Sequence, residues 1–256
     1  MWLVLTINPT AAQQQSSVYL EDHTWPEVRD KLAAGYTTII IPTGGTEQNG
    51  PHLALGKHNA IVSFTAGEIA RNLGNALVAP TLAYVPEGRI SPPEGHMRFP
   101  GTISVRAEHV AGLLEDAARS FKQHGFTHIV LLGDHGGTQA PMKKVARRLS
   151  DEWQSLPHQV LYISDYYKEN GQVEWAKKEN ISVRDLNAHG GFADTSELLA
   201  TDKRLVRPSL VRPYSREDSA TYGVSGDPSK ATAQYGQQLL RLKIGAATKQ
   251  IRGMIR

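Results

Sequence analysis

The apolar residues of the chain fall into short continuous runs, separated by longer segments with helical spacing. The run Thr37-Thr-Ile-Ile-Ile-Pro42 is rich in β-branched residues and lacks polar alternation, which is typical of a strand buried on both faces. Comparable runs predict further strands at residues 76–79, 127–132 and 159–164. Short buried strands therefore recur along the first part of the chain.

The segments between these runs carry apolar residues three or four positions apart, which is the spacing of one helix face. Residues 25–34 predict a helix with Thr24 as its cap, Pro26 at its first position and Gly35 at its end. Further helices are predicted at residues 62–73, ended by Gly74, at 110–121, after Gly137 with Pro141 in the first turn, near Thr195, and at 229–251.

This order of strands and helices predicts an α/β fold. Alternating strands and helices build a parallel sheet with helices on both faces and right-handed crossovers. The pattern loosens through residues 166–187 and then resumes with helices, so we predict a single domain over residues 18–256. A length of 256 residues with 40% hydrophobic content is enough to bury a full core.

Residues 1–17 are predicted to be a disordered tail or the remnant of a signal peptide. Residues 2–7 are apolar and small residues follow them, but a basic segment is missing and the apolar run is short. The expected location is therefore the cytoplasm, or the periplasm if residues 1–12 are a truncated signal peptide.

The charge balance and the lack of long apolar runs exclude two classes of partner. Lys plus Arg total 28 and Asp plus Glu total 25, and this net charge of +3 is too small for the clustered basic face that binds nucleic acid. No apolar run approaches the roughly 18 residues that a membrane span needs. We expect neither a nucleic-acid partner nor a membrane partner.

Polar loops rich in histidine follow the predicted strands. Ligands of open parallel sheets bind beyond the carboxyl ends of the strands. Because the chain has ten histidines and no cysteine, a metal site there would use nitrogen and oxygen ligands. Such atoms are carried in these loops by Glu47, Asn49, His52, His58, Glu94, His96, Asp134, His135, His189, Asp194 and Glu197.

Three of these residues are the strongest candidates for one site. A single loop histidine is more often a spacer or a surface residue than a ligand. Glu47, His58 and His135, however, are expected at the ends of neighbouring strands. Two histidines and one carboxylate with an open position are the ligands of a hydrolytic zinc site. A metal-dependent hydrolase is therefore one candidate function, with separate surface or spacer roles for these residues as the alternative.

Five motifs run in a fixed order over most of the chain. Residues 45–54 read Gly-Thr-Glu-Gln-Asn-Gly-Pro-His-Leu-Ala, residues 99–103 read Phe-Pro-Gly-Thr-Ile, and residues 133–138 read Gly-Asp-His-Gly-Gly-Thr. Residues 189–196 read His-Gly-Gly-Phe-Ala-Asp-Thr-Ser, and residues 226–228 read Gly-Asp-Pro. In these motifs the chain resembles the creatininase family, the creatinine amidohydrolase-like metal hydrolases.

The resemblance implies a three-layer α/β/α sandwich with a mainly parallel sheet, assembly into a homo-oligomer that is commonly a hexamer, and cleavage of amide C–N bonds at a divalent metal. It implies that Glu47 and His135 are metal ligands and that His189 contacts the substrate or moves protons. Asn49 and His58 depart from the family, which has a second-metal His and a bridging Asp at these positions. A neutral imidazole cannot bridge two metals as a carboxylate does.

We therefore predict one metal ion, Zn with Mn or Fe as alternatives, held by Glu47, His58 and His135. Such an ion lowers the pKa of a bound water toward about 7. The proton of that water would pass to His189 or Asp194, with Asp134 as a further candidate. Asp194 can equally be read as a helix cap. Asn49, His52 and His96 are predicted to contact the ligands or the substrate.

The leading hypothesis is a metal-dependent amidohydrolase that acts on a small-molecule amide or cyclic amide. A non-catalytic ligand-binding or scaffold member of the family is the first alternative. A metal enzyme with different chemistry, such as deformylation or peptide-bond cleavage, is the second. His58 discriminates, because convergence on Glu47 and His135 favours hydrolysis, whereas exposure to solvent favours a binding protein.

Overall fold

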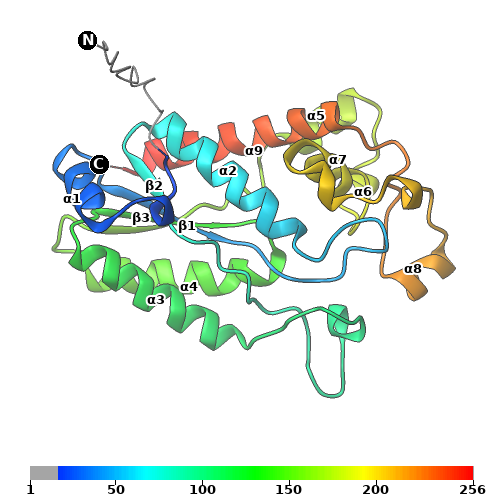
Figure 1. The fold of residues 1–256 in the computed structure, drawn as a ribbon, viewed down its shortest axis with the longest axis horizontal. Coiled ribbons are helices and arrows are strands. Elements are labelled where there is room, and N and C mark those ends of the chain that lie inside the picture. The colour runs from blue at the N-terminus through cyan, green and yellow to red at the C-terminus, as the bar shows by residue number, and fades with distance from the viewer. Residues whose placement is uncertain (1–16, 256) are drawn as a thin grey trace, which may run out of the picture.

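A four-stranded parallel sheet forms the centre of the computed structural model, which describes residues 17–255 (Figure 1). Its strands are β1 (Thr38–Thr43), β2 (Ala76–Val78), β3 (His128–Gly133) and β4 (Gln159–Tyr162), in the order β2-β1-β3-β4. Ile39 pairs with Leu77 on one side and with Ile129 on the other. The predicted strands are thus confirmed, although the fourth ends two residues early. The expected tail at residues 1–17 lies, except for Ser17, outside the described residues.

Helices cover both faces of this sheet and give the predicted three layers. On one face α3 (Ala107–Gln123) and α4 (Gly136–Glu152) pack on Ile39 and Ile41, and α1 (Trp25–Ala33) adds Val28 and Leu32 to the same cluster. On the other face α2 (Lys57–Leu73) and α9 (Ala233–Met254) pack on Ile40 (Figure 1). Adjacent strand residues point to opposite faces, so an unbroken apolar strand supplies both cores.

Beyond the carboxyl ends of the strands lie shorter helices. These are α5 (Gln172–Lys178), α6 (Val183–Leu186), α7 (Phe192–Thr201) and α8 (Arg216–Tyr222), together with the 3-10 turns Gly95–Arg98, Lys203–Leu205 and Pro208–Leu210. A further 3-10 turn, Leu20–Asp22, precedes α1, and Leu20 packs on the same cluster as Val28 and Leu32. Helix α7 packs closely on α9, where Gly236 faces the Ser196 carbonyl. This packing ties the region that Figure 1 shows at the right to the central layers.

Three helix starts differ from the prediction. Helix α2 begins at Lys57, so His58 lies in its first turn and not in the preceding loop. Helix α4 begins at Gly136, where the His135 side chain accepts a bond from the Gly137 N–H, and Pro141 therefore lies inside the helix. Helix α9 starts at Ala233 because the Thr232 side chain caps it. These starts depend on side-chain caps and tertiary contacts that apolar spacing does not reveal.

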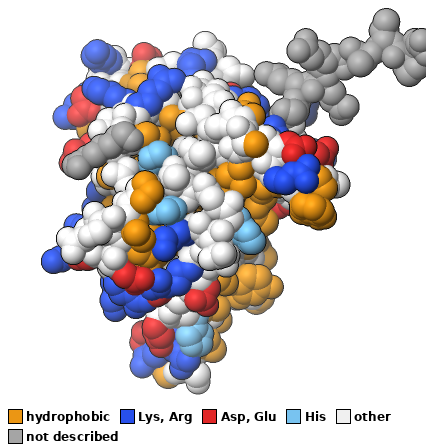
Figure 2. Space-filling view, turned by 90° about the vertical axis from the view of Figure 1, so that its left-hand side faces the viewer, with side chains coloured by type: hydrophobic (Ala, Val, Ile, Leu, Met, Phe, Trp, Pro, Cys, Tyr) orange, Lys and Arg blue, Asp and Glu red, His pale blue; other side chains and the backbone are white. Residues whose placement is uncertain are grey.

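The surface around α1 mixes basic and acidic side chains with apolar ones and presents no continuous basic face in this view (Figure 2). Within the described residues, no helix is long and apolar enough to cross a membrane.

Candidate metal centre

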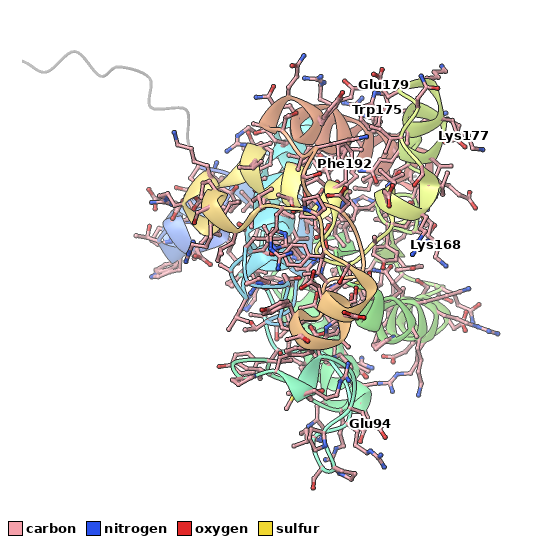
Figure 3. All side chains as sticks on the ribbon, turned by 90° about the vertical axis from the view of Figure 1, so that its right-hand side faces the viewer. Glu94, Lys168, Trp175, Lys177, Glu179 and Phe192 are labelled. Atoms are coloured by element: carbon pink, nitrogen blue, oxygen red, sulfur yellow. The ribbon has the colours of Figure 1, made fainter. Side chains whose placement is uncertain are left out.

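The loops that follow the strands enclose a pocket of about 550 Å³ at the carboxyl edge of the sheet. Figure 3 looks onto this side of the molecule. Of the residues predicted for the site, Glu47, His58, His96, Asp134, His135, His189, Asp194 and Glu197 line the pocket. The structure thus brings Glu47, His58 and His135 together, although His58 comes from the first turn of α2 and not from the end of a strand.

Glu47 lies at the centre of the cluster, with 0% of its surface exposed. Its Oε1 is 2.9 Å from His58 Nε2 and 3.7 Å from His189 Nδ1. Its Oε2 is 3.2 Å from both His96 Nε2 and His135 Nε2. Burial raises the pKa of Glu47, but the neighbouring His135 and His58 outweigh burial and lower the pKa overall. Glu47 is thus ionised and surrounded by four imidazoles.

Asp134 fixes the orientation of His58. The Asp134 Oδ2 atom is 2.7 Å from His58 Nδ1, so Nδ1–H donates and Nε2 faces Glu47. Lys243 Nζ and the Tyr166 hydroxyl donate to the other oxygen of Asp134 at 2.6 and 2.9 Å. A carboxylate behind a histidine in this way sets its tautomer and strengthens it as a metal ligand.

Burial lowers the pKa of His58, and the charge of Lys57 lowers it further. Hydrogen bonds with Asp134 and Glu47 outweigh both effects, so the pKa is raised overall. Burial also acts on Asp134, whose pKa it raises, but the charges of Lys243 and His58 lower that pKa overall. The pair is therefore held together by charge as well as by geometry.

Glu87, from the loop after β2, is a member of the cluster that the sequence prediction missed. Its Oε2 lies 3.0 Å from His135 Nε2, and neither of its buried oxygens has a partner with hydrogen-bond geometry. Burial raises the pKa of Glu87 to about 7. His135 lies between Glu87 and Glu47, and the proximity of these two carboxylates outweighs burial and raises its pKa to about 9.

Gln48 positions the two histidines on the other side of Glu47. The Gln48 backbone carbonyl is 2.8 Å from His189 Nε2, so Nε2–H donates to it and leaves His189 Nδ1 facing Glu47. The Gln48 side-chain nitrogen, 2.9 Å from His96 Nδ1, donates to that atom. Burial and the charge of Lys57 lower the pKa of His189 to about 4, and burial lowers that of His96. Both imidazoles are therefore neutral near pH 7.

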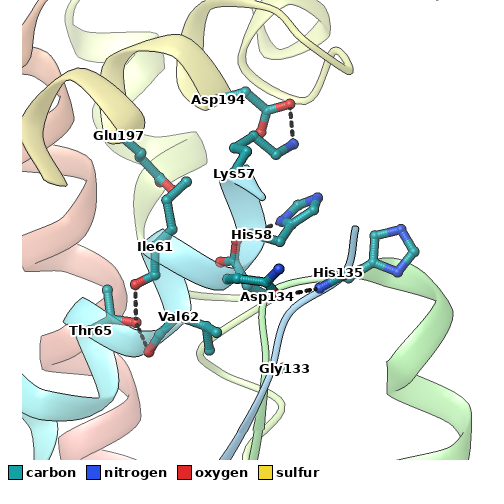
Figure 4. Close-up of polar contacts among 12 residues, drawn as sticks. Lys57, His58, Ile61, Val62, Thr65, Gly133, Asp134, His135, Asp194 and Glu197 are labelled. Atoms are coloured by element: carbon teal, nitrogen blue, oxygen red, sulfur yellow. Dashed lines mark hydrogen bonds and ion pairs between the residues drawn. The ribbon is translucent and has the colours of Figure 1, made fainter. Parts of the chain in front are cut away.

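Asp194 is bound to a buried lysine. Its Oδ2 accepts a hydrogen bond from Lys57 Nζ at 2.7 Å (Figure 4). The same oxygen accepts another from the Gly190 N–H at 2.8 Å. The N-cap of α7 is Gly191, so Asp194 lies in the first turn of the helix instead of at its cap. Both carboxylates that were predicted as proton acceptors, Asp134 and Asp194, thus have cationic partners.

The remaining predicted residues lie outside the pocket wall. Asn49 donates to the Glu47 carbonyl oxygen at 2.8 Å and so braces the loop. His52 contacts Thr195 Oγ1 at 3.1 Å and stacks on Tyr214. Glu94 pairs with Arg89 and points away from Trp175 and Phe192 in Figure 3. The loop that carries Glu94 nevertheless delivers His96 and Glu87 to the site.

Two of the site residues that the sequence prediction missed could have been found from their positions in the sequence. Glu87 follows β2, and the rule that ligands gather at the carboxyl ends of strands applies to its loop as well. Lys57 directly precedes His58 in the sequence. Lys243 gave no such signal, because it reaches Asp134 from a helix 109 positions further along the chain.

The donor atoms of the site fit a divalent metal. One ligand atom each from Glu47, His58 and His135 lies within 4.8 Å of the others, and the same holds for Glu47, His96 and His189. Glu47 Oε2 is buried without a hydrogen-bond partner. His58 Nε2 faces a carboxylate oxygen of Glu47 at 2.9 Å, and a cation that replaced the proton between them would bind both atoms. His58 converges on the cluster and does not point to solvent.

The chain matches a known protein family over most of its length. The creatininase family, described as creatinine amidohydrolase, matches residues 21–251. The chain belongs to the creatininase family. A creatinine amidohydrolase of Pseudomonas putida is 26% identical over 226 residues, 85% of each chain. A mycofactocin precursor peptide peptidase of Mycolicibacterium smegmatis is 27% identical over 221 residues, 84% of each chain.

Solved creatininase structures share the fold. One described as "Creatininase Mn" has a TM-score of 0.75 and 24% identity, covering 94% of this chain and 99% of that one. A creatinine amidohydrolase structure has a TM-score of 0.73 and 24% identity, covering 92% and 97%. A mutant creatininase is described as a Zn-Zn type. The predicted three-layer α/β/α fold is thus confirmed.

Proposed function

We propose that the protein is a metal-dependent amidohydrolase that cleaves the C–N bond of a small amide or cyclic amide. One divalent ion, Zn with Mn or Fe as alternatives, would be held by Glu47, His58 and His135. The observation that carries the proposal is the His58 geometry, in which Asp134 directs Nε2 to Glu47 at 2.9 Å. When bound, the ion would polarise the scissile carbonyl and activate water for attack.

His189 is proposed as the group that moves the proton. The His189 imidazole is neutral, and its Nδ1 lies 3.7 Å from Glu47 Oε1. Asp134 and Asp194, in contrast, already accept hydrogen bonds from lysine ammonium groups. The water oxygen bonds to the carbonyl carbon, and His189 Nδ1 accepts the water's proton. The C–N bond then breaks, and His189 returns this proton to the leaving nitrogen. Asp134 positions His58, and Asp194 positions Lys57.

Peptide bonds are the second substrate class for the same chemistry. This candidate rests on the similarity to mycofactocin precursor peptide peptidases, which is as strong as that to creatinine amidohydrolase. A panel of substrates should therefore include linear amides, lactams and short peptides.

The test is turnover of this panel by metal-free protein before and after addition of Zn²⁺, Mn²⁺ or Fe²⁺. We expect hydrolysis only after metal addition. The His58→Ala variant should lose both bound metal and turnover, because Nε2 is a proposed ligand. His109→Ala, on α3 away from the pocket, is the matched control and should keep both.

Two results would count against the proposal. Turnover by His58→Ala protein that has lost its metal would show that the metal is not needed for the reaction. Metal binding with no turnover of any amide, lactam or peptide would favour the ligand-binding alternative.

A further inference from the structure

Lys57 is a buried cation in the wall of the proposed active site. It is the first residue of α2 and lines the pocket, although only 1% of its side chain is exposed. Its Nζ donates to Asp194 Oδ2 at 2.7 Å and lies 3.8 Å from Glu47 Oε1 (Figure 4). Lys57 is neither a metal ligand nor the proton carrier in the function proposed above, so its role is unassigned.

The ammonium of Lys57 has unused hydrogen-bond donors. A lysine ammonium carries three N–H donors. One is donated to Asp194, and the described residues provide no acceptor with hydrogen-bond geometry for the remaining ones. Leaving a buried charge incompletely hydrogen-bonded is costly. The pocket that Lys57 lines is therefore where an oxygen atom of a ligand would complete its coordination.

Lys57 remains charged in this setting. Burial lowers the pKa of its ammonium, but the charges of Asp194 and Glu47 outweigh burial and raise the pKa overall. The same positive charge lowers the pKa of the neighbouring His189. A fixed cation thus faces the pocket.

The geometry places this cation beside the reacting groups. Glu47 Oε1 is the common neighbour of Lys57 Nζ at 3.8 Å, His58 Nε2 at 2.9 Å and His189 Nδ1 at 3.7 Å. A carbonyl carbon attacked between the metal ligands and His189 would have its oxygen within reach of the ammonium. Donors aimed at a developing oxyanion are among the strongest contributions to catalysis.

We propose that Lys57 is a catalytic residue that donates hydrogen bonds to the scissile carbonyl oxygen and to the oxyanion formed from it. This inference rests on the proposed amidohydrolase function. When water bonds to the carbonyl carbon, the carbonyl π electrons move to the oxygen, which the ammonium stabilises without giving up a proton. As the C–N bond breaks, these electrons re-form the C=O bond. The positive charge of Lys57 also disfavours the binding of a second metal ion on this side of Glu47.

The test uses methylphosphonate, whose tetrahedral anionic oxygens imitate the oxyanion, and Zn²⁺-loaded protein. Titration calorimetry would compare the wild type with Lys57→Met/Asp194→Asn, which removes both charges of the pair together and leaves no unpaired carboxylate. We expect the double variant to bind methylphosphonate about 10-fold or more weakly. Asp194→Asn alone should bind methylphosphonate more tightly than the double variant, because the ammonium remains.

Two further variants complete the design. Lys57→Arg preserves the charge and should keep part of the methylphosphonate affinity. It replaces the double variant in the comparison if the double variant does not fold. Lys168→Met removes an exposed lysine at the outer pocket wall and should bind as the wild type does. For any amide that is turned over, kcat of the double variant should fall about 100-fold with a smaller change in KM.

The outcomes separate the two proposals. Failure of the wild type to take up Zn²⁺ would refute the metal site, and with it the proposed function. Normal Zn²⁺ uptake with equal methylphosphonate affinity in the wild type and the double variant would refute the role of Lys57 alone. Zn²⁺-loaded wild type that does not bind methylphosphonate would also contradict that role.

Discussion

Among single residues, each charged or ionisable side chain of the site is held in its orientation by a specific neighbouring side chain. Glu47 contacts four imidazoles, and carboxylates or Gln48 orient those rings in turn. Removing one charge from such a cluster leaves its partner buried and unpaired, which costs more than the pair contributed. Conservative substitutions are therefore the informative ones.

Asp134→Asn tests whether the carboxylate behind His58 supports metal binding. The amide still accepts the His58 Nδ1–H bond but lacks the charge that strengthens the ligand. We expect metal affinity to fall by about 10- to 100-fold, measured by competition with a chelator. Asp116→Asn, on the exposed surface of α3, is the control and should bind metal normally. Unchanged affinity in Asp134→Asn would contradict this role.

His189 gives the metal-free protein a pH dependence of known sign. Its pKa is lowered to about 4 in the folded state from 6.5. As the pH falls between these values, the unfolded chain binds a proton that the folded chain does not, so the free energy of unfolding decreases by up to about 1.4 kcal/mol per pH unit. Denaturant unfolding should show a smaller loss for His189→Gln than for the wild type. Equal slopes would mean that His189 titrates normally in the fold.

Among the secondary-structure elements, the strands and most helices could be predicted, because the spacing of apolar residues and the runs of β-branched residues indicate which positions are buried. The first run, residues 37–42, became β1 because a central parallel strand is covered on both faces. The same reasoning could not place Lys243, which meets Asp134 from another element. Contacts between distant elements depend on packing, and local pattern does not encode packing.

The contact between α7 and α9 offers a test of packing within one helix. A Cβ at Gly236 would overlap the Ser196 carbonyl oxygen, whereas a Cβ at Gly245, on the exposed side of α9, meets nothing within 4 Å. Gly236→Ala should lower the free energy of unfolding by roughly 1–3 kcal/mol. Gly245→Ala should raise it by up to about 1 kcal/mol, because alanine favours helix. Equal effects in urea unfolding would contradict the close contact.

At the scale of the whole molecule, large apolar side chains remain on the surface. Trp25, Tyr84 and Ile90 are 75%, 57% and 59% exposed, and two of them lie on the loop that delivers His96 to the site. The loop with Tyr84 and Ile90 is where we propose a contact with another copy of the chain. We propose a homo-oligomer, with a hexamer as the expected form.

Light scattering coupled to size exclusion would measure the assembly. We expect a mass near six times the 28.1 kDa of the chain. Ile90→Asp, which places a charge on the exposed loop, should shift the protein toward smaller species if this loop lies in the interface. A wild-type mass of a single chain would rule out the proposed assembly.

Anomalous X-ray diffraction would locate the metal ion proposed to bind Glu47, His58 and His135. Crystals of zinc-loaded protein would be measured on both sides of the zinc absorption edge. We expect one anomalous peak per chain, within bonding distance of His58 Nε2, His135 Nε2 and a Glu47 oxygen. A peak between His96 and His189 instead, two peaks around Glu47, or no peak in the pocket would contradict it.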